Sequence, residues 1–376
     1  MSRTRTYLDA NATAPLLPAA REAMVAALDA AGNPSSVHEE GRRAKRTVET
    51  ARAAVADLFG AAPRTVVFTS GGTEANHLAL RGVGRVRRLL VSAVEHDCVM
   101  AAAKASGRAV TVVPVDAQGR VSAQAVSEAL GEDGADALVS VMAANNETGV
   151  IQPVAEIAEA AHLKGALMHC DAAQAPGRMG LSRWAHGPDL LTLSAHKMGG
   201  PQGVGALIVK DGIELAALTT GGGQEMGRRA GTEAVAVIAG FGAAAAALAA
   251  WEQDRLAVLR DRFEAAVLEA GGEIAGAGAP RLANTSCAIL AGVPAETQVM
   301  TLDLGGIAVS AGSACSSGKV RRSHVLEAMG LDEERAGSAI RVSLPWSVQA
   351  EDVERLIASW RAMAERLAPA TREKVA

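Results

Sequence analysis

The middle of the chain alternates short apolar runs with longer segments of helical periodicity. The apolar runs predict buried strands, and the segments between them predict helices. The expected strands cover residues 65–68, 88–92, 109–115, 137–142, 166–170, 190–193 and 205–209, and the expected helices cover 73–81, 122–130, 153–164 and a segment after residue 96. Strands that alternate with helices favour a mostly parallel sheet covered on both faces. We therefore predict an α/β fold whose ligand site lies at the carboxyl ends of the strands.

The flanking regions have a different pattern. Helices are expected at 18–31 and 36–59, an extended helical region at 232–270, short strands at 286–290, 307–310 and 339–344, and a closing helix at 350–367. The short strands together with the closing helix predict a second, smaller α+β lobe. We accordingly predict a large domain at 15–255 and a small domain made of 1–14 and 256–376.

The composition indicates a globular protein. Of 376 residues, 49% are hydrophobic and 21% are charged, and the formal net charge of -4 gives no general reason to expect a nucleic acid or an acidic membrane as partner. The first residues lack the apolar segment of a secretory signal, and the alanine-rich run at 242–250 is too short to span a bilayer. We expect a cytoplasmic location.

The four cysteines are far apart in the sequence and form no Cys-x-x-Cys pair. This spacing predicts neither a disulfide framework nor a zinc site, and it fits a reducing cytoplasm. Cys315 stands among small polar residues, from Ser310 to Lys319, and not in an apolar run. It is either an accessible, reactive thiol on a loop or an inert one, since reactivity requires both access and a lowered pKa.

Lys197 directly follows the apolar run 190–193 and is flanked by small residues and an imidazole. One interpretation is an ordinary turn lysine. The other is a hemmed-in amine with a lowered pKa, which becomes a nucleophile toward carbonyl groups.

Three other strand ends carry polar groups. Gly71 and Gly72 lead into a helix that begins near Thr73, and such a start either cradles a phosphate or is simply capped by the threonine. Asp171 follows the strand 166–170 and either caps a helix or holds the ring nitrogen of a pyridoxal cofactor protonated. His96 is either a surface histidine or a group that stacks on a flat ring and moves protons.

Three further segments of the sequence contain polar or charged residues whose role remains open. Asn145 and Asn146 either bind a carboxylate or a ring oxygen, or only shape a turn. Arg341, on an otherwise apolar strand, either binds a substrate carboxylate with two hydrogen bonds or is an edge-strand charge. The glycine- and arginine-rich stretch 221–232, which ends at Thr232, either meets an anion or is a linker.

Taken together and in this order, the motifs resemble the cysteine desulfurases of the NifS/IscS type, which are fold type I pyridoxal phosphate enzymes related to class-V aminotransferases. The matching stretches cover residues 7–13, 32–38, 68–76, 95–96, 145–149, 171–174, 194–197, 221–225, 313–318 and 340–341. The resemblance implies a large domain with a mostly parallel seven-stranded sheet and a smaller α+β domain.

The resemblance also implies roles in binding pyridoxal 5'-phosphate. Lys197 would hold the cofactor covalently and later move the Cα proton of the substrate. Asp171 would pair with the ring nitrogen, Gln174 would contact the ring hydroxyl, and His96 would stack on the ring and take part in catalysis. The phosphate would be held by Gly72, Thr73, Ser194 and His196, and by Thr232 of a second subunit, which implies a homodimer.

The substrate implied is L-cysteine. Asn146, which also lies at the cofactor, and Arg341 would orient its carboxylate. Cys315 would attack its sulfur, release L-alanine and keep a persulfide for an acceptor protein such as an iron–sulfur cluster scaffold. No resident metal is implied, although Cys315 is a candidate for a transient iron–sulfur ligand. Cleavage of a carbon–sulfur bond without loss of free sulfide does require a second nucleophile besides the lysine.

The chain departs from the family pattern at several positions. Ala14 and Ala234 replace a common threonine and a common asparagine, Arg321 and Arg322 stand where relatives often carry Glu-Pro, and no long tail follows the last helix. These departures concern the sulfur acceptor more than the chemistry. The alternatives are a selenocysteine lyase, a related aminotransferase, or a non-catalytic sulfur carrier that uses Cys315 alone.

Overall fold

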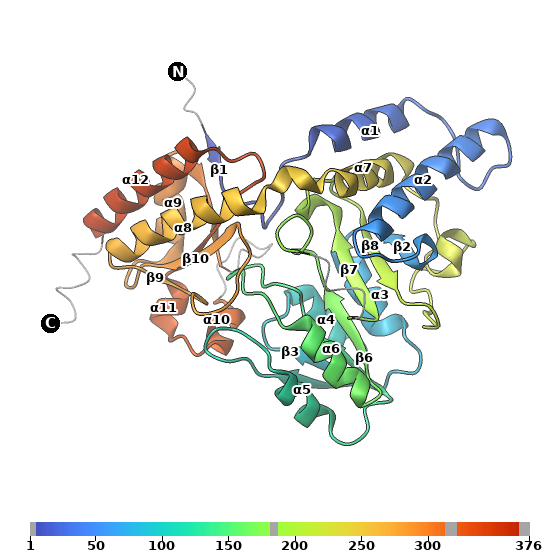
Figure 1. Cartoon of the computed structure of the whole chain (residues 1–376), viewed down its shortest axis with the longest axis horizontal. Helices are drawn as coiled ribbons and strands as arrows, with labels where there is room; N and C mark the ends of the chain where they lie inside the picture. The colour runs from blue at the N-terminus through green and yellow to red at the C-terminus, as the bar shows by residue number, and fades with distance from the viewer. Residues whose placement is uncertain (1–4, 181–186, 313–321, 368–376) are drawn as a thin grey trace.

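The computed structural model describes residues 5–180, 187–312 and 322–367. Figure 1 shows a large lobe built around one sheet beside a smaller lobe, with β1 (Thr6–Tyr7) lying in the smaller lobe although it begins the chain. Among the described residues, no helix combines the length and the apolar character needed to cross a membrane.

The large lobe contains the predicted sheet of seven strands, in the order β2-β8-β7-β6-β5-β3-β4. The strands are β2 (Val66–Thr69), β3 (Arg88–Ser92), β4 (Ala109–Val113), β5 (Ala137–Ser140), β6 (Leu167–Asp171), β7 (Leu190–Ser194) and β8 (Gly205–Val209). Only β8 runs against its neighbours, β2 and β7, so the prediction of a mostly parallel sheet is confirmed. The third and fourth expected strands end two residues early, at Val113 and Ser140.

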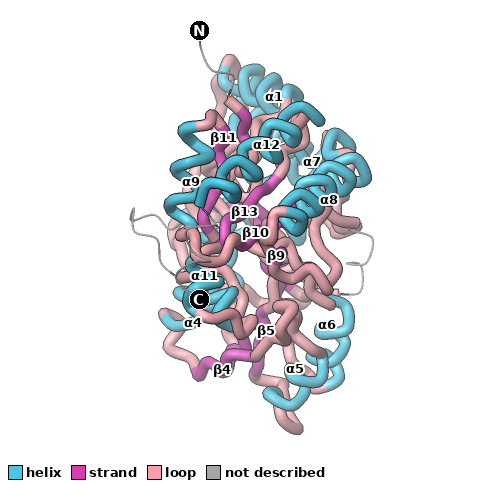
Figure 2. The backbone as a smooth tube through the Cα atoms, turned by 90° about the vertical axis from the view of Figure 1, so that its left-hand side faces the viewer, coloured by secondary structure: helices cyan, strands magenta, loops and turns pink. Residues whose placement is uncertain are grey.

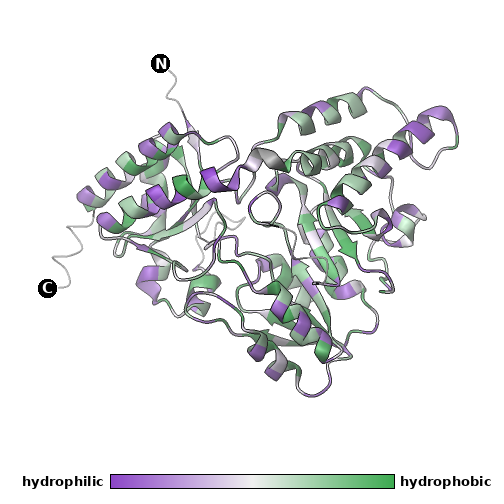
Figure 3. Ribbon diagram, in the orientation of Figure 1, coloured by the Kyte–Doolittle hydropathy of each residue, from purple (hydrophilic) through white to green (hydrophobic). Residues whose placement is uncertain are grey.

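Helices cover both faces of the sheet: successive side chains of one strand belong to different apolar clusters. Leu89 and Val91 of β3 belong to one apolar cluster and Leu90 to another, because neighbouring residues of a strand point to opposite faces. The first cluster includes α3 (Gly72–Gly82) and α4 (Asp97–Lys104), and the second includes α2 (Glu39–Asp57), α5 (Ala123–Leu130), α6 (Val154–Leu163) and α7 (Val235–Ala246). In Figure 3 the strands of this sheet are mostly green, the colour of hydrophobic residues.

Two expected helices differ in detail. The expected helix at 36–59 starts at Glu39, because His38 caps it by accepting a hydrogen bond from the Gly41 amide. The extended helix expected at 232–270 is wrong as a continuous element. It is broken into α7, a short 3₁₀ helix (Leu248–Trp251) and α8 (Gln253–Glu269), with Glu252 at φ 24°. The fully buried Trp251 at this break belongs to the apolar cluster of the small lobe, and its ring also contacts Arg178.

The small lobe holds an antiparallel sheet in the order β12-β13-β10-β9. Its strands are β9 (Glu273–Ile274), β10 (Thr285–Ile289), β12 (Ser310–Ala311) and β13 (Ala339–Ser343), while β11 (Ile307–Ala308) pairs with β1. The strand expected at 307–310 is therefore two short strands in different sheets. The pattern of hydrophobic and polar residues did not predict β9, α9 (Ala295–Leu304), α10 (His324–Ala328) or α11 (Glu333–Gly337).

The two ends of the chain share one apolar core in the small lobe. Figure 2 shows α12 (Ala350–Leu367) and α8 near the strands of this lobe, and the rings of Phe263 and Trp360 meet edge to face at 5.7 Å. Leu8, Ala10 and Ala14 pack into the same cluster. This packing supports the proposed division into 15–255 and 1–14 with 256–376, which stays a prediction. The remaining helix, α1 (Pro18–Leu28), packs against α7.

Candidate active site

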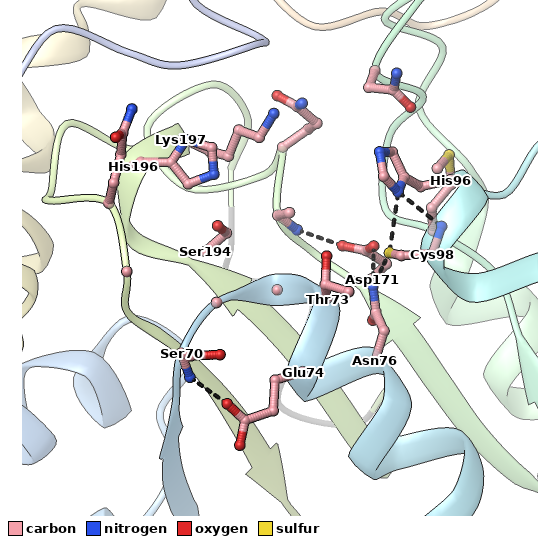
Figure 4. Close-up of a pocket in the computed structure, with 18 of the residues that line it drawn as sticks. Ser70, Thr73, Glu74, Asn76, His96, Cys98, Asp171, Ser194, His196 and Lys197 are labelled. Carbon is pink, nitrogen blue, oxygen red and sulfur yellow. Dashed lines mark hydrogen bonds between the residues drawn. The ribbon is translucent and has the colours of Figure 1, made fainter. Parts of the chain in front are cut away.

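A cavity of about 490 Å³ lies where β6 and β7 end and α3 begins (Figure 4). The sequence-predicted residues that line it are Gly72, Thr73, His96, Asn146, Asp171, Gln174, Ser194, His196 and Lys197. Since the carboxyl ends of parallel strands meet at one edge of a sheet, residues far apart in the sequence are collected there.

Lys197 ends a 3₁₀ turn that directly follows β7. Its Nζ donates hydrogen bonds to the main-chain oxygens of Asn11 and, at 3.0 Å, Ala12. Burial, followed by the nearby Arg341 and Arg178 cations, lowers the pKa of this amine to about 7. An amine with such a pKa is present in part as the free base at neutral pH, and the free base is the form that attacks carbonyls.

Asp171 ends β6 and is oriented from two sides. Its Oδ2 accepts a hydrogen bond from Asn76 Nδ2 at 2.7 Å, and its Oδ1 accepts one from the Ala173 amide at 3.0 Å. Sequence reasoning missed Asn76. Its spacing of four residues from Gly72 was the available signal, because i and i+4 lie on one face of a helix.

The start of α3 provides room for an anion. A Cβ on Gly72 would lie 3.3 Å from the Ser194 Cβ, whereas one on Gly71 would meet nothing within 4 Å. The amides at this helix start and the hydroxyl-bearing residues Thr73 and Ser194 border the cavity. A helix of eleven residues directs its amide groups and the positive end of its dipole to this place, an arrangement that can stabilise an anion.

Two histidines border the cavity in neutral form. Burial, then Lys197 and Arg178, lower the pKa of His196 to about 4, and its Nδ1 lies 2.6 Å from Thr13 Oγ1. Burial also lowers the pKa of His96. His96 Nδ1 accepts a hydrogen bond from the Cys98 amide at 3.1 Å, so the proton of the neutral ring sits on Nε2. The sequence analysis did not predict Cys98 as a site residue, and burial raises the pKa of its thiol to about 12.

A second cavity of about 230 Å³ adjoins the first and shares His96, Asn146 and Lys197 with it. Arg341 of β13 lines this cavity. One of its guanidinium nitrogens donates to the Asn146 main-chain oxygen at 3.1 Å, and another pairs with Asp9 Oδ1 at 2.7 Å. The sequence analysis named no role for Asp9.

Two predicted residues are not brought into the cavity by the described structure. Thr232 is exposed on this chain and does not border either cavity. Cys315, like Arg321, lies outside the described residues. Within the described ranges, no group of three or more His, Cys, Asp or Glu side chains is arranged to hold a metal ion.

The comparisons with known proteins agree with this geometry. The family model "Aminotransferase class-V" matches residues 6–356, and the chain belongs to that family, whose general property is the use of pyridoxal phosphate. Within the family, the chain is similar to a cysteine desulfurase of Cereibacter sphaeroides, with 42% identity over 94% of each chain. It is also 42% identical to an IscS-like cysteine desulfurase of Mycobacterium tuberculosis, over 93% of each chain.

Solved structures give the same result. A NifS-like protein from Rickettsia africae has a TM-score of 0.88 and 34% identity, covering 96% of this chain and 100% of its own. SspA in complex with cysteine has a TM-score of 0.79 and 31% identity, covering 90% and 99%. The resemblance inferred from the motifs and the fold type I architecture are thereby confirmed.

Proposed function

We propose that the protein is a pyridoxal phosphate-dependent cysteine desulfurase that converts L-cysteine to L-alanine and a persulfide on Cys315. One observation carries the proposal: a half-buried lysine amine with a pKa of about 7 borders the same cavity as a carboxylate and a helix start, in a chain 42% identical to cysteine desulfurases. The proposed location is the cytoplasm.

The donor set of the cavity fits pyridoxal phosphate. The start of α3, where Gly72 lets the main chain approach Ser194, suits the phosphate, and the free base of Lys197 suits the carbonyl. Asn76 Oδ1 is buried and has no hydrogen-bond partner among the described residues, so this wall of the cavity contains one unused hydrogen-bond acceptor. When bound, the cofactor supplies an electron sink for the substrate Cα.

We assign each group its role on that basis. Asp171 would hold the ring nitrogen, Gln174 the ring hydroxyl, His96 and Asn146 the ring surroundings, and Gly72, Thr73, Ser194, His196 and a partner copy's Thr232 the phosphate. The exposed position of Thr232 on one chain is compatible with a homodimer, which stays a prediction.

The substrate would bind in the second cavity. Arg341 would meet its carboxylate, although Asp9 already occupies one side of the guanidinium, and the side chain of Asn146 would help to orient it. Lys197 lies between the two cavities, and its free base would accept the Cα proton there.

Sulfur transfer would be the work of Cys315. Its thiolate would form a bond to the substrate sulfur while the carbon–sulfur bond breaks and the carbon keeps the electron pair. Gly312, the last described residue before Cys315 in the sequence, lines the substrate cavity. The persulfide would pass to an acceptor protein, for which an iron–sulfur cluster scaffold is one candidate.

The test is an L-cysteine assay on Cys315→Ser beside wild type, reading both alanine and persulfide. We expect Cys315→Ser to bind the cofactor as wild type does but to form no persulfide, because a hydroxyl is a far weaker nucleophile toward sulfur. Cys287→Ala, which changes a buried cysteine outside both cavities, is the matched control and should retain transfer. Undiminished persulfide formation by Cys315→Ser would refute the proposed nucleophile.

A parallel assay with selenocysteine separates the proposal from its enzyme alternative. Alanine formed from selenocysteine but not from cysteine would make the protein a selenocysteine lyase. A wild-type protein that binds no pyridoxal phosphate would leave only the sulfur-carrier alternative.

A further inference from the structure

Arg178 is a buried arginine just after the predicted cofactor residues, and the sequence analysis assigned it no role. Its side chain is fully enclosed, with a relative exposure of 1%. The guanidinium donates hydrogen bonds to four oxygens: Asn11 Oδ1 at 3.0 Å, the Ala10 main-chain oxygen at 3.0 Å, Gln174 Oε1, and the Lys197 main-chain oxygen. One side chain thus joins the N-terminal segment to two residues of the cavity.

All four of these acceptors are carbonyl or amide oxygens and none is a carboxylate. A buried cation without a carboxylate is costly, and burial lowers the pKa of Arg178 to about 9. The Trp251 ring lies 4.8 Å from the guanidinium carbon and offers a cation–π contact in partial compensation. A Cβ on Gly177, which has φ 77°, would lie 2.6 Å from that ring, so the adjacent residue must be glycine for the ring to fit.

The contact with Gln174 fixes the orientation of its amide. Arg178 donates to Oε1, and Gln174 Nε2 donates to the Asn11 main-chain oxygen at 3.0 Å. An amide flipped by 180° would point its NH₂ at a guanidinium that can only donate. Gln174 borders the larger cavity, so Arg178 determines the orientation of an amide at the site: the amide oxygen accepts from Arg178, and the NH₂ group is the donor end.

We propose that Arg178 is a positioning residue of the desulfurase centre, which fixes the Gln174 amide and the Lys197 main chain against the N-terminal segment and places a positive charge near the lysine. The inference rests on the proposed function, since it concerns residues that would hold pyridoxal phosphate.

The charge has a direct consequence for Lys197. The cations Arg341 and Arg178 face its amine together with the anions Asp9 and Asp171, and the cations favour the free base. Removal of one cation removes part of that effect, so the pKa of Lys197 rises toward its ordinary value.

The test compares Arg178→Met, which removes the charge, with Arg178→Lys, which keeps it. The apoprotein is mixed with pyridoxal phosphate across a pH series, the adduct is fixed by borohydride reduction, and Lys197 labelling is read by mass spectrometry. Wild type should label with a midpoint near pH 7. In Arg178→Met the midpoint should rise by about one pH unit, and kcat with L-cysteine should fall about tenfold to a hundredfold because the lysine and the glutamine are misplaced.

Arg178→Lys should restore the wild-type midpoint but only part of kcat, since one ammonium group cannot hold oxygens on both sides as a guanidinium does. A wild-type midpoint and kcat in Arg178→Met would overturn the proposal, and so would a variant that only unfolds at a lower temperature while its midpoint is unchanged. If Arg178→Met does not fold, the kcat of Arg178→Lys is the decisive measurement. A kcat equal to that of wild type in Arg178→Lys would then overturn the proposal. Failure of wild type to label at all would instead overturn the proposed function.

Discussion

The active centre has two walls of different origin. The strand-end wall consists of Gly72, Thr73, Asp171, Ser194 and Lys197, each of which lies at or within four residues of the end of β2, β6 or β7. The cross-lobe wall consists of residues 9–12 with Arg341, which come from the two ends of the chain.

The two walls also differ in what they provide. The strand-end wall offers the amine, the carboxylate and the helix start that a bound cofactor needs. The cross-lobe wall offers main-chain oxygens that hold the amine of Lys197 and a cation that lowers its pKa. Local sequence therefore places the reactive groups, whereas long-range contacts set their protonation and their orientation.

The largest effect is expected in the strand-end wall. Lys197→Ala should reduce alanine formation from L-cysteine to below about a thousandth of wild type, because the variant has neither the cofactor attachment nor the proton acceptor. The visible absorbance of the lysine-bound cofactor should disappear with it. Lys210→Ala, which changes an exposed lysine near the end of β8, is the control and should match wild type. Substantial turnover in Lys197→Ala would remove the strand-end wall from the chemistry.

A smaller and different effect is expected in the cross-lobe wall. Arg341→Gln should raise the KM for L-cysteine about a hundredfold while kcat changes less, because a buried charge contact to the substrate carboxylate is lost and Asp9 loses the cation that pairs with it. Steady-state kinetics separate the two constants. Arg361→Gln removes an exposed ion pair with Glu269 and serves as the matched control. A loss of kcat at unchanged KM would contradict the assignment of Arg341 to substrate binding.

The smallest effect concerns stability and tests whether the two walls are coupled. The folded pKa of Lys197 is about 7 and its unfolded value 10.5, so the folded state disfavours the protonated amine. The contribution of Lys197 to stability therefore rises with pH between about 7 and 10.5, because the unfolded state binds more protons there. Below that window the cost of burying the cation is fully present.

Lys197→Met removes this cost. The free energy of unfolding of the apoprotein, measured by denaturant titration, should be higher in Lys197→Met than in wild type at pH 7 and below. The difference should shrink as the pH rises toward 10. A pH-independent difference would mean that the cross-lobe wall does not lower the pKa of the lysine.

Much of the fold and of the strand-end wall could be predicted from the sequence. The strands β3 and β8 and the helix α12 match their expected bounds, because apolar runs and helical periodicity are local properties. The break at Trp251 was not predicted, since most residues around it favour helix and neither glycine nor proline stands there. It is the burial of one ring against Gly177 and Arg178, far away in sequence, that ends the helix there.

The sequence by itself determined that an amine, a carboxylate and a glycine-rich helix start lie at one edge of a parallel sheet, since strand ends of the same direction meet there. Only the tertiary structure decided what faces them. The contact between Asp9 and Arg341 joins residues 332 positions apart, and it exists because β1 pairs with β11 and Asp9 with Ser343 of β13. Two of the four contacts of Arg178, those to Ala10 and Asn11, depend on the same docking of the N-terminal segment, so the spacing of residues in the sequence could not predict them.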